Sequence, residues 1–430
     1  MIRRLVLFAV LCLLAAACTA NSQPSTTAGE GSTTSSGLPD GTSTTLEPPT
    51  WTELPGIEDL PQSVQDELLE LVRATEELRG LRFVDPPMIS LVSEAELETR
   101  VRESISEQAE DFPADEALYK LLGLLEPGTD LETLLSDLYG EQAAGFYDGE
   151  TGELVVPIRA VGFTITQKVV MVHELTHALT DQHFEFEPKL REMFDADEFD
   201  QASGYLALIE GDAQHVEFLY VQSLSFAELG EFVAEVLELE TPALDAAPPF
   251  IQDTLLFPYD SGLGFVQRLQ SLGGWESVND AYLDFPGLPP STEQIMTPSD
   301  FGRDLPRDVG LPPLEVPGYT LQYDSVWGEF GFRSMLDQVL GEDIGQVAAD
   351  GWGGDAYYQW FDGQNTAIII GYQGDTAADL AELEDALLSF ARTSVPEEDW
   401  VWVESFGDIL YFIAADETSV GESLLAAVRA

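Results

Sequence analysis

Apolar residues recur at helical spacing through the first two thirds of the chain. After Pro61, the residues Val64, Leu68, Leu71, Val72 and Leu78 fall on one face of a helix that Ser63 can cap. The same kind of spacing predicts helices over residues 94–108, 114–125, 131–139, 166–182 and 203–224. The segment 144–157 is different, because two short apolar runs flank the turn-forming sequence Asp148-Gly149-Glu150-Thr151-Gly152. This pattern predicts a β-hairpin.

The last part of the chain carries a weak internal repeat. Residues 357–362 and 366–372 predict a hairpin that is followed by a helix over 376–393, and residues 400–404 and 409–414 predict a second hairpin followed by a helix over 419–429. Two such ββα units favour an antiparallel sheet with helices on one face. A Pro- and Gly-rich region over residues 285–317 precedes them. We therefore predict an α+β fold, with a mainly helical domain over residues 53–305 that carries a small edge hairpin, and a smaller α+β domain over 306–430.

The N-terminus has the pattern of an export signal. Arg3 and Arg4 precede an apolar run that is shorter than a membrane span and ends in small residues. The ending Leu-Ala-Ala-Ala-Cys resembles a lipobox, which implies removal of residues 1–17 and acylation of Cys18. Residues 18–52 are rich in Ser, Thr, Gly and Pro, and this composition predicts a disordered tether. We expect a secreted protein that its lipid holds to the outer face of the bacterial cell membrane.

Charge and cysteine content restrict the chemistry. The chain has 18 Lys and Arg against 78 Asp and Glu, for a formal net charge of -60. Nucleic acid is excluded as a partner, because phosphate binding needs clustered basic residues. Cys12 would leave with the signal and Cys18 would be acylated, so that a bound metal has to use histidines and carboxylates.

The sequence His173-Glu174-Leu175-Thr176-His177 is the strongest chemical signal. His173 and His177 are one helical turn apart, so both imidazoles project from one face and can share a cation, and Glu174 lies beside them to accept a proton from a metal-bound water. Apolar neighbours on both sides predict a buried helix. If the two histidines were only core residues, Glu174 would be buried without a cause. We therefore predict a Zn²⁺ site.

Zinc in a catalytic site usually needs a third protein ligand, and two residues compete for this role. With Glu210 on the following helix, the segment 146–220 resembles the gluzincins, the thermolysin-type zinc metallopeptidases with the pattern HExxH…E. The rival is His183, which stands where the metzincin pattern HExxHxxGxxH has its third ligand. That pattern needs Gly for a sharp turn, whereas this chain has Thr180, and a continuing helix would carry His183 away. We favour Glu210.

Two departures from the gluzincin pattern concern the supporting residues. Thermolysin-type enzymes have an acidic residue four positions after the Glu ligand, which orients the first histidine, but Gln214 stands there. Either Asp212 substitutes from another direction or the orienting residue comes from elsewhere in the chain. The residue that stabilises the transition state is also undefined, and His215, Tyr205 and Tyr259 are the candidates. In addition, the segment 289–298 resembles one in uncharacterised bacterial proteins that also carry HELTH and Glu-Gly-Asp-Ala, where His often replaces Thr297.

The gluzincin resemblance implies a peptidase that acts outside the cytoplasm on a peptide or protein substrate. Zinc would activate a water, Glu174 would act as general base, and the hairpin over 146–156 would supply an edge strand that pairs with the substrate. Two alternatives stay open: a catalytically weak or inactive lipoprotein that uses the same fold as a binding module, and a metal-dependent hydrolase of another kind. Trp327 and the loop at Trp352 are aromatic features for which we expect core packing rather than substrate binding.

Overall fold

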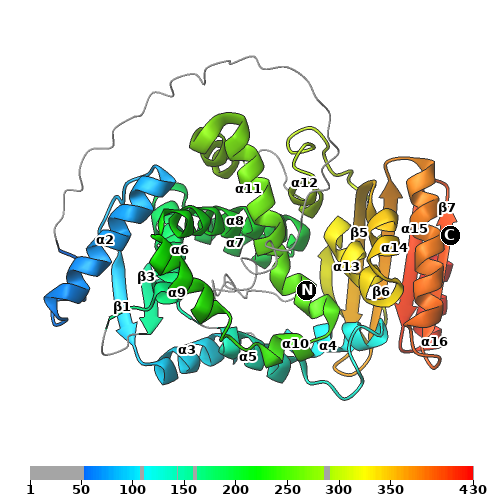
Figure 1. Ribbon diagram of the computed structural model, residues 1–430. Helices are drawn as coiled ribbons and strands as arrows, with labels where there is room; N and C mark the ends of the chain where they lie inside the picture. The colour runs from blue at the N-terminus through cyan, green and yellow to red at the C-terminus, as the bar shows by residue number, and fades with distance from the viewer. Residues whose placement is uncertain (1–52, 107–110, 143, 158–161, 285–290, 430) are drawn as a thin grey trace, which may run out of the picture.

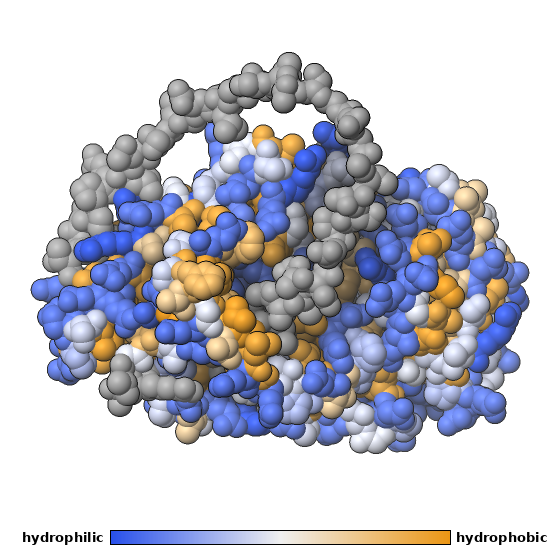
Figure 2. Space-filling model, in the orientation of Figure 1, coloured by the Kyte–Doolittle hydropathy of each residue, from blue (hydrophilic) through white to orange (hydrophobic). Residues whose placement is uncertain are grey.

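The computed structural model describes residues 53–106, 111–142, 144–157, 162–284 and 291–429. The expected signal peptide, the acylated Cys18 and the tether lie outside these residues. Within the described part of the chain, no helix has both the length and the apolar character that crossing a membrane requires. Hydrophilic residues cover most of the surface that Figure 2 displays, as the charge of -60 leads one to expect.

The first part of the molecule is mainly helical (Figure 1). Its helices are α2 (Gln62–Arg79), α3 (Glu94–Ser106), α4 (Phe112–Leu121), α5 (Leu131–Gln142), α6 (Ile165–Phe184), α7 (Phe186–Asp195), α8 (Phe199–Ser223), α9 (Phe226–Val236), α10 (Pro242–Ala246), α11 (Pro249–Asp284) and α12 (Thr292–Met296). Six of these helices, α2 to α6 and α8, were predicted from the spacing of apolar residues, and their ends agree with the prediction within a few residues. Helices α7 and α9 to α12 were not predicted.

Helices α6 and α8 form the centre of this part. Helix α6 begins with a capping box, in which the Thr164 hydroxyl accepts a hydrogen bond from the Gln167 N–H and the Gln167 side chain accepts one from the Thr164 N–H. Helix α8 crosses α11 at very close range, since a Cβ added to Gly211 would lie 2.2 Å from the backbone of Gly262. Glycine at both positions therefore lets the two helix backbones touch.

A small three-stranded sheet lies beside α6. The predicted hairpin is present as β2 (Phe146–Asp148) and β3 (Glu153–Pro157), which pair antiparallel, and β1 (Met88–Val92) adds to the other side of β3 in parallel. The strand order β1-β3-β2 leaves β2 at the edge of this sheet. Strand β1 was not predicted, because a run of five residues with four apolar side chains has no clear period, and its pairing partner lies far along the chain.

The C-terminal part contains one antiparallel sheet of five strands. Its elements are β4 (Thr320–Ser325), α13 (Gly328–Leu340), α14 (Glu342–Ala349), β5 (Trp352–Phe361), β6 (Thr366–Gly374), α15 (Ala377–Thr393), β7 (Trp400–Phe406), β8 (Ile409–Ala415) and α16 (Thr418–Val428). The strand order is β4-β5-β6-β8-β7, so both predicted ββα units are present and their hairpins meet at β6 and β8. The predicted α+β class, with a helical first part and an antiparallel sheet after it, is confirmed.

One detail of that sheet differs from the prediction of helices on one face. Ile368 and Phe412 belong to the same buried cluster as Leu387 of α15, whereas their neighbours Ile369 and Ile413 cluster with Leu424 of α16. Because successive residues of a strand point to opposite faces, α15 and α16 cover opposite faces of the sheet. The physical reason is the continuous apolar run in β6, which needs cover on both sides.

The helical part and the sheet share one continuous hydrophobic cluster. Helix α4, from the first part of the chain, packs against the C-terminal sheet, where the Gln359 side chain donates a hydrogen bond of 2.8 Å to the Ala114 carbonyl. Trp327 and Trp352 are buried in this region with 2% and 1% of their surface exposed, as expected for core packing. The division into domains at residues 305 and 306 stays a prediction.

Candidate metal centre

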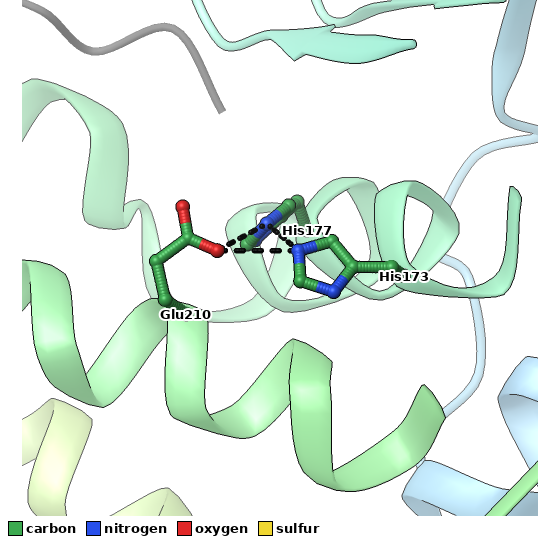
Figure 3. Close-up of side chains that lie close together, drawn as sticks. All are labelled: His173, His177 and Glu210. Atoms are coloured by element: carbon green, nitrogen blue, oxygen red, sulfur yellow. Dashed lines mark hydrogen bonds and ion pairs between the residues drawn. The ribbon is translucent and has the colours of Figure 1, made fainter. Parts of the chain in front are cut away.

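Three side chains converge between α6 and α8 (Figure 3). His173 and His177 project from one face of α6, and Glu210 projects toward them from α8. The two imidazole Nε2 atoms are 3.0 Å apart, and the Oε2 atom of Glu210 lies 3.2 Å from Nε2 of His173 and 3.3 Å from Nε2 of His177. All three residues are almost fully buried. They form a group that can hold a metal ion.

The spacing of these three atoms matches a small tetrahedral cation. Two ligands at about 2.0–2.1 Å from a tetrahedral centre are about 3.3 Å apart, close to the three separations of 3.0, 3.2 and 3.3 Å between the donor atoms. Two imidazoles and a carboxylate are also a donor set that suits Zn²⁺. The residues therefore fit a metal of this kind.

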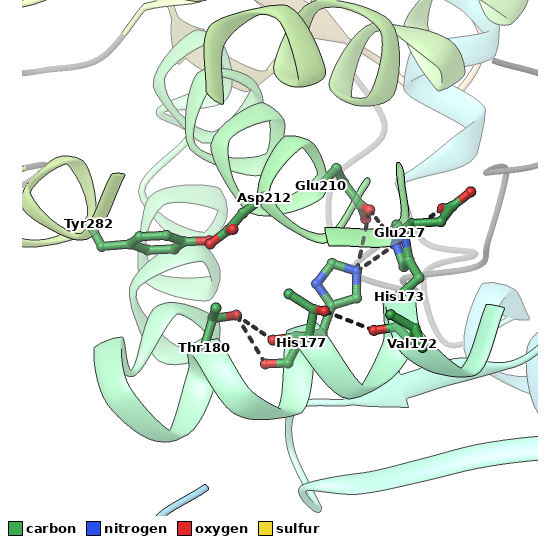
Figure 4. A network of polar contacts seen from close by, with 9 residues as sticks. Val172, His173, His177, Thr180, Glu210, Asp212, Glu217 and Tyr282 are labelled. Carbon is green, nitrogen blue, oxygen red and sulfur yellow. Dashed lines mark hydrogen bonds and ion pairs between the residues drawn. The ribbon is translucent and has the colours of Figure 1, made fainter. Parts of the chain in front are cut away.

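The hydrogen bonding of His173 gives a second reason for a cation. Its Nδ1 atom lies 3.3 Å from Oε2 of Glu217, a carboxylate oxygen that can only accept (Figure 4). When Nδ1 carries the proton for this bond, neutral His173 presents a lone pair at Nε2 toward the carboxylate of Glu210. In this neutral form two acceptors face each other in a buried site and repel unless a cation, either a proton on Nε2 or a metal ion, lies between them.

The charges of the group are strongly coupled. Burial pushes the pKa of Glu210 upward, but the two histidines outweigh this effect and lower the pKa to about 2. Burial also opposes the charge on His173, but the hydrogen bonds to Glu210 and Glu217 raise the pKa of that imidazole to about 10. The pocket thus strongly favours positive charge beside Glu210, which a metal ion supplies.

Glu174 is fully buried next to the histidines. Burial raises the pKa of this carboxyl group to about 8, against the opposing effect of His173. The backbone N–H of Tyr147 in β2 faces the carboxylate without a hydrogen bond of normal geometry. Strand β2 is fixed to α6 by the Tyr147 hydroxyl, which donates to Oδ2 of Asp181 at 2.9 Å. The edge strand and Glu174 are therefore close to each other.

The rival ligand His183 lies away from the group. Helix α6 continues past Thr180 to Phe184, and the exposed imidazole of His183 has its Nε2 atom 2.6 Å from the carbonyl oxygen of Arg82. A helix that continues through Thr180 was the reason for favouring Glu210. The structure brings together the favoured set and leaves His183 outside it.

The three candidates for a transition-state stabiliser are in different places. The ring of Tyr259 is stacked against that of His173, with centroids 6.4 Å apart. His215 lies on another side of α8, where its Nε2 atom is 2.7 Å from Oε1 of Gln270, and Tyr205 packs edge-on against Tyr282. Tyr259 is therefore the candidate whose ring is stacked against a candidate metal ligand.

Asp212 makes no hydrogen bond to His173 or His177. It accepts a hydrogen bond of 2.9 Å from Nε of Arg79 and one of 3.1 Å from the hydroxyl of Tyr282. Arg79 also donates to Asn279 and lies over the ring of Trp275. Both members of this ion pair are completely buried, so it holds α2, α8 and α11 together behind the metal group.

Glu217 is the site residue that the sequence analysis missed. The acidic residue expected four positions after Glu210 is replaced by Gln214, and Glu217, seven positions after Glu210, contacts His173 instead. Seven residues are about two helical turns, so Glu210 and Glu217 lie on the same face of α8. A search of this helix at both spacings would have found it.

Known proteins match only part of this chain. Residues 319–421, from the start of the C-terminal sheet into α16, match a family described as a domain of unknown function (DUF8575). No curated protein matches the chain. A crystal structure of a candidate hydrolase with a novel fold from Chloroflexus aurantiacus is similar at 17% identity and a TM-score of 0.37, over 56% of this chain and 88% of that one. The family match contains none of the three residues that converge between α6 and α8.

Proposed function

We propose that this protein is a zinc-dependent peptidase that acts outside the cytoplasm. The observation that carries the proposal is the convergence of His173, His177 and Glu210 with the buried carboxyl group of Glu174 beside them. A Zn²⁺ ion held by the three ligands supplies a Lewis acid and lowers the pKa of a coordinated water. No nucleophilic side chain of the protein is needed for hydrolysis.

The residues around this group have separate roles in the proposal. Glu174 accepts a proton from the attacking water and gives it to the leaving amine, and its pKa of about 8 suits both steps near neutral pH. Glu217 holds the His173 ring in position. Strand β2 is at a sheet edge next to α6, where an extended peptide can add as a further strand. Tyr259 is our candidate for the donor that stabilises the developing negative charge.

The test compares Glu174→Gln with the parent protein. We expect the variant to keep one equivalent of zinc, measured by atomic emission, and to lose hydrolysis of an unfolded generic protein substrate by at least about a hundredfold. His183→Ala is the matched control, because it removes an exposed histidine from the same helix. It should change neither zinc content nor rate.

Two results would contradict this function. If the parent protein holds zinc but its rate equals that of Glu174→Gln, the site is not hydrolytic, and the binding-module alternative is supported. If zinc is lost from His183→Ala but retained by Glu210→Ala, the ligand set is wrong. Hydrolysis of non-peptide substrates alone, with the same dependence on Glu174, would assign another kind of hydrolase.

A further inference from the structure

The segment that begins at Ser291 has no part in the proposed chemistry, yet it buries a carboxylate. Glu293 in α12 has only 6% of its surface exposed. Its carboxylate makes no hydrogen bond or ion pair with the residues that the structure describes. A buried carboxylate is normally paired, because removing its charge from water is costly. The surroundings of Glu293 therefore need an explanation.

Two further carboxylates meet Glu293. Asp304 comes from the turn after α12, and Asp375 follows the last residue of β6. One oxygen of each of the three carboxylates lies within 4.8 Å of the others. Helix α12 packs against α8, α11 and α13 at the side of the helical part that faces the C-terminal sheet (Figure 1). The three residues therefore join segments from both parts of the molecule.

Neighbouring groups hold these carboxylates in place. The Gln294 side chain donates to the Asp304 carbonyl and accepts a hydrogen bond from the Gly302 N–H. Arg307 donates through Nη2 to Oδ1 of Asp375 at 2.9 Å and through Nη1 to the Gly374 carbonyl at 2.7 Å. The second oxygen of Asp375 is not used by Arg307.

Acidic groups dominate the surroundings of Glu293, although Arg307 pairs with Asp375. Burial raises the pKa of Glu293 to about 9, and the charged groups with the largest effects on it are acidic: Glu329, Asp304, Asp375 and Asp200. Glu329 is itself buried, with 6% of its surface exposed. Near neutral pH the Glu293 carboxyl carries a proton unless a cation takes its place, and a divalent cation would offset the repulsion among the ionised carboxylates.

We propose that Glu293, Asp304 and Asp375 bind a calcium ion, which fixes α12 to the end of β6. Ligands that are all carboxylate oxygens select hard cations rather than zinc. Calcium takes its oxygen ligands at about 2.3–2.6 Å, so ligand oxygens on one ion can be up to about 5 Å apart. Magnesium demands a tighter octahedron at about 2.0–2.1 Å, which three side chains from three segments match less well.

Calcium binding to the full chain tests the site, because each variant changes a single carboxylate. Titrations are made in about 0.15 M KCl, which screens the weak binding expected of a very acidic surface. Glu293→Gln keeps the size of the side chain and removes its charge, and Asp304→Asn does the same for a second ligand. Glu238→Gln, at an exposed position on the helical part, is the matched control.

We expect one saturable calcium site in the parent protein, with Kd on the order of 10⁻⁴–10⁻³ M. Saturation should raise the Tm by about 3 °C. Glu293→Gln and Asp304→Asn should each weaken binding at least tenfold and lose this shift, whereas Glu238→Gln should behave as the parent. Equal calcium stoichiometry and equal Tm shifts in the parent and in both site variants would overturn the proposal. So would binding of magnesium with the same affinity as calcium.

Discussion

Replacing Glu217 by Gln tests whether this carboxylate positions a metal ligand. Its Oε2 atom lies 3.3 Å from Nδ1 of His173, and only 5% of its side chain and 1% of the His173 side chain are exposed. Loss of a residue that orients a histidine ligand typically lowers metal affinity about 10–100-fold, or about 1.4–2.7 kcal/mol. Because 3.3 Å is long for a charge-assisted hydrogen bond, we expect a loss near tenfold.

The assay is competition for Zn²⁺ between the protein and a chromophoric chelator at fixed pH. Glu217→Gln can still accept a hydrogen bond from His173 through its amide oxygen, so the fold should be retained. The control is Glu231→Gln, which removes a negative charge from an exposed position of the neighbouring helix α9. Zinc affinity in Glu217→Gln equal to that of the parent and the control would refute the positioning role. Equal loss in both variants would show that only the overall charge matters.

Two further predictions concern stability. Gly211→Ala on α8 places a methyl group 2.2 Å from the backbone of Gly262 on α11 and should lower the free energy of unfolding by about 1–3 kcal/mol. The control is Gly264→Ala on α11, where an added methyl group meets no other part of the protein within 4 Å, and it should be neutral or stabilising in thermal denaturation. Equal Tm values in the two variants would contradict a close crossing. Burial raises the pKa of Asp200 to about 7, above its ordinary 3.8. The folded state therefore binds this proton more tightly than the unfolded state does. The resulting stabilisation is complete below about pH 4 and is lost as the pH rises through 7. The Tm of metal-free protein should therefore fall over this range, and Asp200→Asn should make the fall smaller; an unchanged slope would show that Asp200 titrates normally.

Local signals were sufficient to predict the elements that hold the candidate metal site. The spacing of His173 and His177, and the apolar residues around them, predicted a buried helix with two ligands on one face, and α6 has this form. Thr180 in place of Gly predicted that the helix continues, which is the reason that His183 lies outside the group. The hairpin and both ββα units were also visible, because turn residues and apolar alternation are local properties.

Other features depend on contacts between distant segments. Strand β1 exists because it pairs with β3, about sixty positions later, and α15 and α16 cover opposite faces because β6 is apolar on both. The carboxylate that contacts His173 comes from Glu217 and not from the expected position at Gln214, since the angle at which α8 passes α6 decides which turn of α8 reaches the far nitrogen of His173. No local pattern contains that angle.

The sequence by itself determined that two histidines and a carboxylate share a helix turn, because helical geometry fixes the relation between residues 173 and 177. It also determined the α+β class and the anionic character of the molecule. Only the tertiary structure decided that Glu210 completes the group, that Asp212 pairs with Arg79, and that Glu293 meets Asp304 and Asp375. The reason is that these relations depend on how helices and strands far apart in the chain pack, and packing depends on the whole core.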